Sequence, residues 1–429
     1  MAPVRTALAA ISLAGGLLAG LLLAEAPGPP NIVLVVMDAF RADRLGAARD
    51  GRELTPNLSR LAAEGVVYEN AYCTAPQTKL STASIFTGRH PSYTGVIDRQ
   101  NTLPPQCTTL AEALRERGYR TLGIHTNAWI DAERQDGFVP RPRGFAAGFH
   151  KWQYLEGDVE DVRFYAGAAE VNEAAINAVK ADIEPTFLYV HYMDTHEPYT
   201  GPEPRWTTGV FHNGASPPQD LHEADAALQE LDWGAPDQIG EEQKRRRARL
   251  YDEAVLYLDG RVGRLVEKLR RRFDRDTVFI ITADHGELLG EHGCWGHARE
   301  LWEEAVRVPL IIVGPGLPAG RRVETRVSTV RLYEWIRALA EGKAAPALSP
   351  EPERLIIQMR TGEGDRVKVI RPDGAAVILR RSLDGEVLSA ESYPLEQDPG
   401  EERPLPVPPS RVESVASVPE QLRRLADSA

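Results

Sequence analysis

Short apolar runs, rich in β-branched residues, alternate along this chain with longer segments of helical character. The runs lie at residues 31–37, 66–72, 120–125, 187–192, 277–282 and 309–313. Apolar runs without polar alternation are typical of strands that are buried on both faces. Strands and helices in this rhythm form a sheet that is covered by helices on both faces. The pattern therefore predicts an α/β fold with a largely parallel mixed sheet over residues 30–345.

Signals at the ends of the intervening segments support the helices. Thr55 and Pro56 suit the N-cap and the first position of a helix that continues to residue 64. Thr109 and Glu112 have the spacing of a capping box. Residues 241–273 form the longest segment of helical character. We expect these helices to cover the sheet.

The pattern changes after residue 350. Strand-like runs follow one another at 366–371, 375–380 and 386–389. A Pro-Asp-Gly turn at 372–374 joins the first two, so we expect a small C-terminal antiparallel β subdomain and tail over residues 350–429. A terminal helix is expected at 417–426. Residues 201–240 lose all periodicity and are expected to form a long loop.

The first 26 residues are typical of a secretory signal peptide. Arg5 precedes an apolar run at 6–24, and small residues at 24 and 26 suit a cleavage site. The same run is long enough to span a bilayer, so an uncleaved membrane anchor is the alternative. Both interpretations predict export to the periplasm or the extracellular space, with membrane contact only through this segment.

Composition excludes some classes of function. Lys and Arg total 50 and Asp and Glu total 62, which gives a net charge of −12. This acidic balance argues against a nucleic-acid scaffold, whose binding surface is usually basic. The chain has three cysteines, too few for a disulfide framework. A hydrophobic core must therefore hold the fold together.

Polar residues follow three of the predicted strands. Asp38 follows the first run, and Asp284 and His285 follow the run at 277–282. Thr78 lies after the second run, at the expected start of a helix, where free N–H groups favour an anion. Each residue alone has a simpler reading as a cap or turn residue. Together they predict a site at the carboxyl edge of the sheet.

These segments resemble the sulfatase family of the alkaline phosphatase superfamily. The resemblance is carried by residues 31–46, 55–57, 86–91, 118–121, 282–293, 301–309 and 398–401, in the family's order. It implies an alkaline-phosphatase-like fold and a catalytic domain at 30–345 that hydrolyses anionic esters.

The resemblance also implies one divalent metal ion, held by Asp38, Thr78, Asp284 and His285, with Thr78 as the nucleophile. A free threonine hydroxyl is a poor nucleophile near neutral pH, and a bound cation favours its alkoxide. Oxygen ligands with one imidazole suit Mn²⁺, Zn²⁺ or Mg²⁺, with Ca²⁺ as an alternative.

Two departures from the family pattern bear on the chemistry. The family forms its formylglycine from the Cys or Ser of a Cys/Ser-x-Pro-x-Arg motif. Residues 78–82 occupy that place as Thr-Lys-Leu-Ser-Thr, so the convertible first residue, the Pro and the Arg of the motif are all missing. We therefore expect no formylglycine. Ala39 replaces a second carboxylate after the first strand. A threonine with an Asp-His pair resembles the phosphodiesterases and the phosphoglycerol or phosphoethanolamine transferases of the superfamily, which form a phosphothreonine.

Two histidines are expected to contact the substrate. The resemblance implies that His196 binds it, and His297 stands where the family has lysine. His297 either binds the ester oxygens or protonates the leaving group. The alternative for both is a second metal site shared with Asp194.

Four more residues are candidates. Lys79 either counters the substrate's charge or faces solvent. His125 and Asn127 are expected at the rim of the site, where they would bind substrate. His191, inside a predicted strand, is either a site residue or a satisfied core histidine.

The sequence therefore predicts an exported, metal-dependent hydrolase of phosphate or sulfate esters, in the first instance a phosphodiesterase with a covalent Thr78 intermediate. The alternatives are a true sulfuric ester hydrolase, a phosphoglycerol- or phosphoethanolamine-type transferase, and a non-catalytic glycan-binding member of the family. The expected partner is an anionic ester of a glycan, a lipid head group or a small molecule.

Overall fold

A computed structural model describes residues 28–97, 101–131, 144–157, 165–180, 184–197, 199, 240–343, 347–348 and 354–418. The predicted signal peptide at 1–26 lies outside these residues. So do nearly all of the predicted loop at 201–240 and the predicted helix at 417–426. Within the described ranges, no helix combines the length and the apolar character that a membrane span requires.

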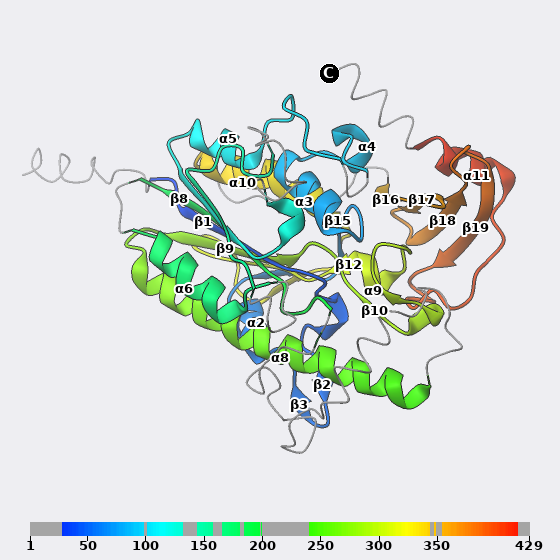
Figure 1. Cartoon of the computed structure of the whole chain (residues 1–429), viewed down its shortest axis with the longest axis horizontal. Coiled ribbons are helices and arrows are strands. Elements are labelled where there is room, and N and C mark those ends of the chain that lie inside the picture. The colour runs from blue at the N-terminus through cyan, green and yellow to red at the C-terminus, as the bar shows by residue number, and fades with distance from the viewer. Residues whose placement is uncertain are drawn as a thin grey trace, which may run out of the picture.

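The core of the molecule is an eight-stranded mixed sheet (Figure 1). In spatial order its strands are β14 (Arg321–Val323), β4 (Val66–Tyr68), β13 (Leu310–Val313), β9 (Thr277–Ala283), β1 (Asn31–Met37), β8 (Thr186–Tyr192), β6 (Arg120–His125) and β7 (Lys151–Tyr154). From β9 to β7 all neighbours are parallel, whereas β13 runs antiparallel to both β9 and β4. The predicted, largely parallel mixed sheet is therefore confirmed.

Helices cover both faces of this sheet (Figure 1). One face carries α2 (Pro56–Glu64), α6 (Ala168–Ala178) and α8 (Glu241–Arg272), and the other carries α3 (Thr78–Thr87), α5 (Leu110–Arg115) and α10 (Leu332–Ala340). The predicted capping box is present, since Thr109 and Glu112 bond each other's backbone N–H groups. The short elements are η1 (Ala42–Arg44), β2 (Ala48–Arg49), β3 (Arg52–Glu53), α4 (Pro91–Thr94), η2 (Ala128–Ile130), β10 (Leu288–Leu289), η5 (Glu291–Gly293), β11 (Trp295–Gly296), α9 (Glu303–Val306) and η6 (Thr329–Arg331).

The single strand predicted at 66–72 is wrong, because it divides between two sheets. Glu69 and Asn70 interrupt it, and the Asn70 side chain donates a hydrogen bond to the carbonyl of Glu324 at 2.7 Å. Beyond this break, β5 (Ala71–Tyr72) pairs with β12 (Arg307–Val308) and β15 (Val327–Ser328) in a separate three-stranded sheet. The polar pair thus redirects the chain toward the start of α3.

The C-terminal subdomain is the predicted antiparallel sheet, with one strand more than expected. Its strands are β16 (Leu355–Thr361), β17 (Gly364–Ile370), β18 (Ala375–Arg381) and β19 (Val387–Pro394), and α11 (Pro409–Ala416) packs against it. The side chains of successive residues point to opposite faces of this sheet. Val367 and Val369 pack with α11, whereas Ile370 joins the main core.

This sheet also contacts the segment that leads into α3. The backbone N–H of Gln358, on β16, donates to the carbonyl of Thr74 at 2.9 Å. The Ser92 hydroxyl donates to the side chain of the same Gln358 at 2.7 Å. The segment before Thr78 is therefore bonded at Thr74 to a strand that lies far away along the chain.

The register of the main sheet sets where the polar residues emerge. Val36 on β1 lies opposite His191 on β8 and opposite Thr282 on β9. Since β1 and β9 end one residue later, Asp38 and Asp284 leave the sheet at the same edge. The carboxyl edge thus places the predicted residues side by side.

Candidate active site

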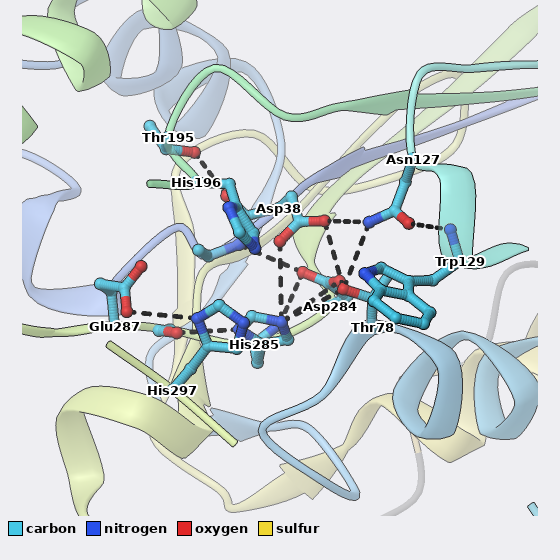
Figure 2. Close-up of polar contacts among 12 residues, drawn as sticks. Asp38, Thr78, Asn127, Trp129, Thr195, His196, Asp284, His285, Glu287 and His297 are labelled. Carbon is cyan, nitrogen blue, oxygen red and sulfur yellow. Dashed lines mark hydrogen bonds and ion pairs between the residues drawn. The ribbon is translucent and has the colours of Figure 1, made fainter. Parts of the chain in front are cut away.

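Two fully buried carboxylates, Asp38 and Asp284, form the centre of the site (Figure 2). Asp38 Oδ2 accepts a hydrogen bond from Asn127 Nδ2 at 2.7 Å. Asp284 Oδ1 accepts the backbone N–H groups of His285 at 2.8 Å and Ala39 at 3.3 Å. The other two oxygens, Asp38 Oδ1 and Asp284 Oδ2, have no hydrogen-bond partner. Each carboxylate thus keeps one buried oxygen for a ligand.

Ala39, in place of the family's second carboxylate, contributes through its backbone. Its φ is 56°, in the left-handed region, which costs a residue with a Cβ atom about 1–2 kcal/mol. In this conformation its N–H reaches Asp284, and its carbonyl accepts the Tyr251 hydroxyl at 2.7 Å. The strain therefore aims a main-chain donor at a carboxylate of the site.

Thr78 is the first residue of α3. Its Oγ1 lies 3.3 Å from Asp38 Oδ2 and 3.4 Å from His285 Nε2. The first turn of a helix has free N–H groups and a positive dipole end, which favour an anion beside the hydroxyl. The nucleophile predicted from the sequence thus lies against the carboxylates and at an anion-binding helix terminus.

His285 presents a ring nitrogen to both orphaned oxygens. Its Nε2 lies 3.6 Å from Asp38 Oδ1 and 3.6 Å from Asp284 Oδ2. Its Nδ1 lies 2.8 Å from the carbonyl of Gly286, which can only accept a hydrogen bond. The hydrogen therefore sits on Nδ1, and the lone pair of Nε2 points toward the carboxylates.

The four predicted ligands, Asp38, Thr78, Asp284 and His285, are brought together. One ligand atom from each carboxylate and one from the imidazole lie within 4.8 Å of one another. Two buried carboxylates with unpartnered oxygens are costly unless a cation neutralises them. The donor set, the burial and the orphaned oxygens therefore fit a divalent metal ion.

Electrostatics within the pair agree with this interpretation. Burial raises the pKa of Asp284, and the negative charge of Asp38 raises it further. Burial would also raise the pKa of Asp38, but the hydrogen bond from His191 and the nearby imidazoles hold it well below its usual range. The Asp38 carboxylate is thus stabilised as an anion by its neighbours, whereas the charge of Asp284 remains uncompensated.

A cavity of about 310 Å³ opens beside this group. It is lined by Gln77, Thr78, Lys79, Trp129, His196, Glu197, His297, Ala298 and Arg299. Three of the predicted substrate-binding residues, Lys79, His196 and His297, therefore lie on the same cavity as Thr78.

The two histidines of the cavity are oriented through their Nδ1 atoms. His196 donates from Nδ1 to the carbonyl of Glu197 at 2.6 Å, and His297 Nδ1 lies 3.2 Å from Glu287 Oε1. The His297 ring lies 4.8 Å from His196 and 4.3 Å from His285, between centroids. Burial lowers the pKa of His297 well below its ordinary value. Both rings therefore keep Nε2 for the substrate.

Glu287 is a buried site residue that the sequence interpretation missed. Burial raises the pKa of its carboxyl to about 7. The available signal was its position two residues after His285, which places it at the same edge of the sheet. Arg247, in the basic run of the long helix α8, is also buried and pairs with Glu197 at 2.6 Å.

The structure places His125 and Asn127 behind the carboxylates and outside the lining of the cavity. Asn127 contacts Asp38, and its Nδ2 lies 3.4 Å from Thr78 Oγ1. His125 donates from Nδ1 to the carbonyl of Asn127 at 3.1 Å, and its ring packs on Trp152. Burial lowers the pKa of His125 to about 3, so the ring is neutral.

Of the three residues of the alternative second metal site, His196 and His297 line the cavity and Asp194 is not among its lining residues. Asp194 Oδ1 accepts the backbone N–H of Ala168 at the start of α6, at 3.0 Å. Among the residues that the structure describes, Asp38, Asp284 and His285 form the one group of three acidic, His or Cys side chains with metal-binding spacing. His191, left open by the sequence, lies with its Nε2 3.2 Å from Asp38 Oδ2.

Comparisons with known proteins agree with this architecture. A family model described as Sulfatase matches residues 30–342. A sulfatase of Formosa agariphila is 26% identical over 380 residues, covering 78% of this chain and 73% of that protein. An ulvan-active sulfatase of the same organism is 25% identical over 367 residues, covering 81% and 68%.

A solved structure, the phosphonate monoester hydrolase of Agrobacterium radiobacter, superposes with a TM-score of 0.69. It is 19% identical to this chain, and the match covers 92% of this chain and 96% of that one. Its likeness shows the fold. Because the family model spans most of the chain and the sheet, helices and C-terminal subdomain agree with its structures, this protein belongs to the sulfatase family and has an alkaline-phosphatase-like fold.

Proposed function

We propose that this protein is an exported, metal-dependent hydrolase of anionic esters that attacks through Thr78, with phosphodiesters as its preferred substrates. The observation that carries the proposal is the position of the Thr78 hydroxyl. It lies within 3.4 Å of Asp38 and His285 and lines the cavity that holds Lys79, His196 and His297.

A divalent metal would be held by Asp38, Thr78, Asp284 and His285. Bound there, it would supply positive charge that favours the Thr78 alkoxide and offsets the charge of the ester oxygens. Asp38 Oδ2, at 3.3 Å, is the group in place to accept the proton of the Thr78 hydroxyl. The start of α3 and the buried Lys79 bind the ester oxygens, which holds the substrate against Thr78.

In the proposed first step, Thr78 Oγ1 forms a bond to phosphorus while the bond from phosphorus to the leaving alcohol breaks. The leaving oxygen takes a proton from Nε2 of His196, an imidazole on the cavity whose pKa is raised, against the effect of burial, by the charges of Asp38 and Glu287. His297, whose pKa burial lowers, is a neutral contact for the ester oxygens. Water then attacks the phosphothreonine and gives a proton to the imidazole of His196, and the bond from phosphorus to Thr78 Oγ1 breaks as that oxygen takes back the proton held by Asp38. Water is the one co-reactant, and each protein group ends in its starting protonation state.

Threonine favours phosphoryl over sulfuryl transfer in this scheme. Formylglycine is an aldehyde, and its hydrate has two hydroxyl groups. When one carries the sulfate, ionisation of the other expels it. Thr78 has one oxygen, so only an attack by water on the intermediate releases it. A phosphothreonine suits this route, which supports the phosphodiesterase assignment.

A true sulfuric ester hydrolase is the second candidate, because the relatives reported above are named sulfatases. The name of one of them, ulvan-active sulfatase, makes a glycan ester one substrate to test for this chain. Export is proposed from the character of residues 1–26.

The test is a side-by-side assay of the purified protein on an aryl phosphodiester, an aryl phosphonate monoester and an aryl sulfate, each with Mn²⁺, Zn²⁺, Mg²⁺ and Ca²⁺. Thr78→Ala should abolish phosphodiester turnover, whereas Thr78→Ser, which keeps a hydroxyl, should retain part of it. Acid quenching followed by peptide mass spectrometry should find phosphate on Thr78.

Sulfate turnover that survives Thr78→Ala would refute the nucleophile. An aldehyde found at Cys73, the cysteine five residues before Thr78, would show a formylglycine and reverse the preference for phosphate over sulfate esters. Transfer of the head group to an added alcohol would favour the transferase reading. Metal binding without turnover of any ester would favour the non-catalytic reading.

A further inference from the structure

His191 is the second-last residue of β8, just before the edge of the sheet at which the proposed metal ligands emerge. It is opposite Val36 on β1. Asp38 comes two residues after Val36, so its side chain lies on the same face of the sheet as that of Val36. The side chain is fully buried, and its Nε2 lies 3.2 Å from Asp38 Oδ2 and 3.8 Å from Asp284 Oδ2. A second imidazole therefore faces the same two carboxylates as His285.

The hydrogen bonds of the two imidazoles favour opposite tautomers. His285 donates from Nδ1 to a carbonyl, so its Nε2 carries a lone pair. His191 Nδ1 lies 2.7 Å from the Tyr189 hydroxyl, which is able to donate to it. The Nε2 of His191 then carries the hydrogen and donates to Asp38, an arrangement that satisfies every group. The reverse tautomer would set a lone pair of Nε2 against a carboxylate.

Asn127 acts on the same oxygen from the other side. Its Oδ1 accepts the backbone N–H of Trp129 at 2.8 Å, so its Nδ2 must point to Asp38 Oδ2, at 2.7 Å. Two N–H donors of fixed orientation therefore engage Oδ2. The partner oxygen, Oδ1, has no hydrogen bond and lies 3.6 Å from His285 Nε2.

We propose that His191 and Asn127 are positioning residues that hold Asp38 Oδ2 by hydrogen bonds, so that Asp38 binds the metal through Oδ1 alone. His285 is then the one imidazole ligand, and Tyr189 orients His191. This inference rests on the metal site of the proposed function. It accounts for two buried polar residues that do not line the cavity.

Substitution should weaken metal binding without removing a ligand. His191→Leu should lower the affinity of the purified protein for Mn²⁺ about 10–100-fold, as is usual for groups that orient a metal ligand. His191→Gln, which keeps an N–H donor, should lose less. Tyr189→Phe should weaken binding a few-fold when His191 is present and have no further effect in the His191→Leu background.

The measurements are Mn²⁺ titration by isothermal calorimetry and electron spin echo spectroscopy of the bound Mn²⁺, with circular dichroism to confirm folding. We expect one coordinated imidazole nitrogen in the wild type and one in His191→Gln. Two in the wild type and one in the variant would overturn the proposal, because His191 would then be a ligand.

Equal affinity in the wild type and His191→Leu would also overturn the proposal while leaving the metal site intact. A Tyr189→Phe effect that is the same with and without His191 would contradict the orienting role. A folded wild-type protein that binds neither Mn²⁺ nor Zn²⁺ would instead refute the proposed function, and this inference with it.

Discussion

Two groups of buried charges in this molecule are built alike but completed differently. The metal cluster contains Asp38 and Asp284, and the lysine cluster contains Glu303 and Glu401. In the lysine cluster, Lys368 from β17 is fully buried, and its Nζ lies 2.7 Å from Glu303 Oε1 and 2.9 Å from Glu401 Oε1. The chain supplies the cation there, whereas in the metal cluster Asp38 Oδ1 and Asp284 Oδ2 face imidazole nitrogens at 3.6 Å or more.

The difference separates structure from function. A buried carboxylate pair that encloses its own lysine joins two parts of the chain, here the C-terminal sheet and the α9 region. A pair that faces imidazoles and keeps unpartnered oxygens is costly unless a ligand completes it. The two carboxylate pairs alone would not distinguish the clusters, but the lysine that the chain places in one of them does.

The strongest test removes one carboxylate of the metal cluster. Asp284→Asn should abolish metal binding and lower turnover at least about 10³-fold, since the metal supplies several kcal/mol of transition-state stabilisation. In chelator, the free energy of unfolding should stay the same or rise, because one of two uncompensated charges is gone. Calorimetry, turnover assays and urea unfolding measure these effects. Full turnover in the variant would remove Asp284 from the metal site.

The lysine cluster should respond in the opposite way. Lys368→Met leaves two buried carboxylates without their cation and should lower the free energy of unfolding by about 3–5 kcal/mol. The exposed pair of Lys343 and Glu341 provides a control, and Lys343→Met should change stability by less than about 1 kcal/mol. Folded Lys368→Met protein should bind Mn²⁺ with wild-type affinity. A large loss of Mn²⁺ affinity in Lys368→Met would show that the lysine cluster and the metal cluster act as one site.

Metal addition should stabilise the wild type through the metal cluster alone. At about 100 times the dissociation constant, a ligand that binds only the folded state adds about 2.7 kcal/mol. Urea unfolding with Mn²⁺ and with chelator should show this difference for the wild type and for Lys343→Met. Asp284→Asn should show none. Equal stabilisation of that variant would place the metal elsewhere.

The pH should also act on the stability of the lysine cluster. Burial raises the pKa of Glu401 to about 7, although Lys368 opposes this. The folded state thus holds the proton more tightly than the unfolded state, so this contribution is complete below about pH 4.5 and is lost as the pH rises through 7. Relative to Glu401→Gln, the wild type should lose up to about 3 kcal/mol between pH 4.5 and 7.5 in urea unfolding. Parallel curves would contradict the assignment.

Elements with strong local signals could be predicted from the sequence. The strand at 31–37 and the capping box of Thr109 and Glu112 depend on nearby residues, and both are confirmed. The strand at 66–72 failed because Asn70 bonds a carbonyl far away in the chain. β16 was missed although its first residues, Leu355, Ile356 and Ile357, form an apolar run of the same kind as the strands that were predicted.

The residues of the candidate site could likewise be predicted only where the sequence carries a signal for them. Asp38, Thr78 and Asp284 could be predicted because the ends of parallel strands share an edge and the family motifs mark them. The role of His191 depends on the Tyr189 hydroxyl and on Asp38 across the sheet, which no spacing in the sequence expresses. Its position inside an apolar strand suggested a core residue equally well.

The hydrogen bond from Gln358 to Thr74 has a consequence for the order in which the protein is made. Ser92 and Gln358, which also bond each other, are separated by 266 positions along the chain. A ribosome thus completes Asp38 and Thr78 well before β16, and the segment before Thr78 gains its support from β16 only after more than 266 further residues have been made. A strand that is synthesised much later therefore completes the surroundings of the proposed nucleophile.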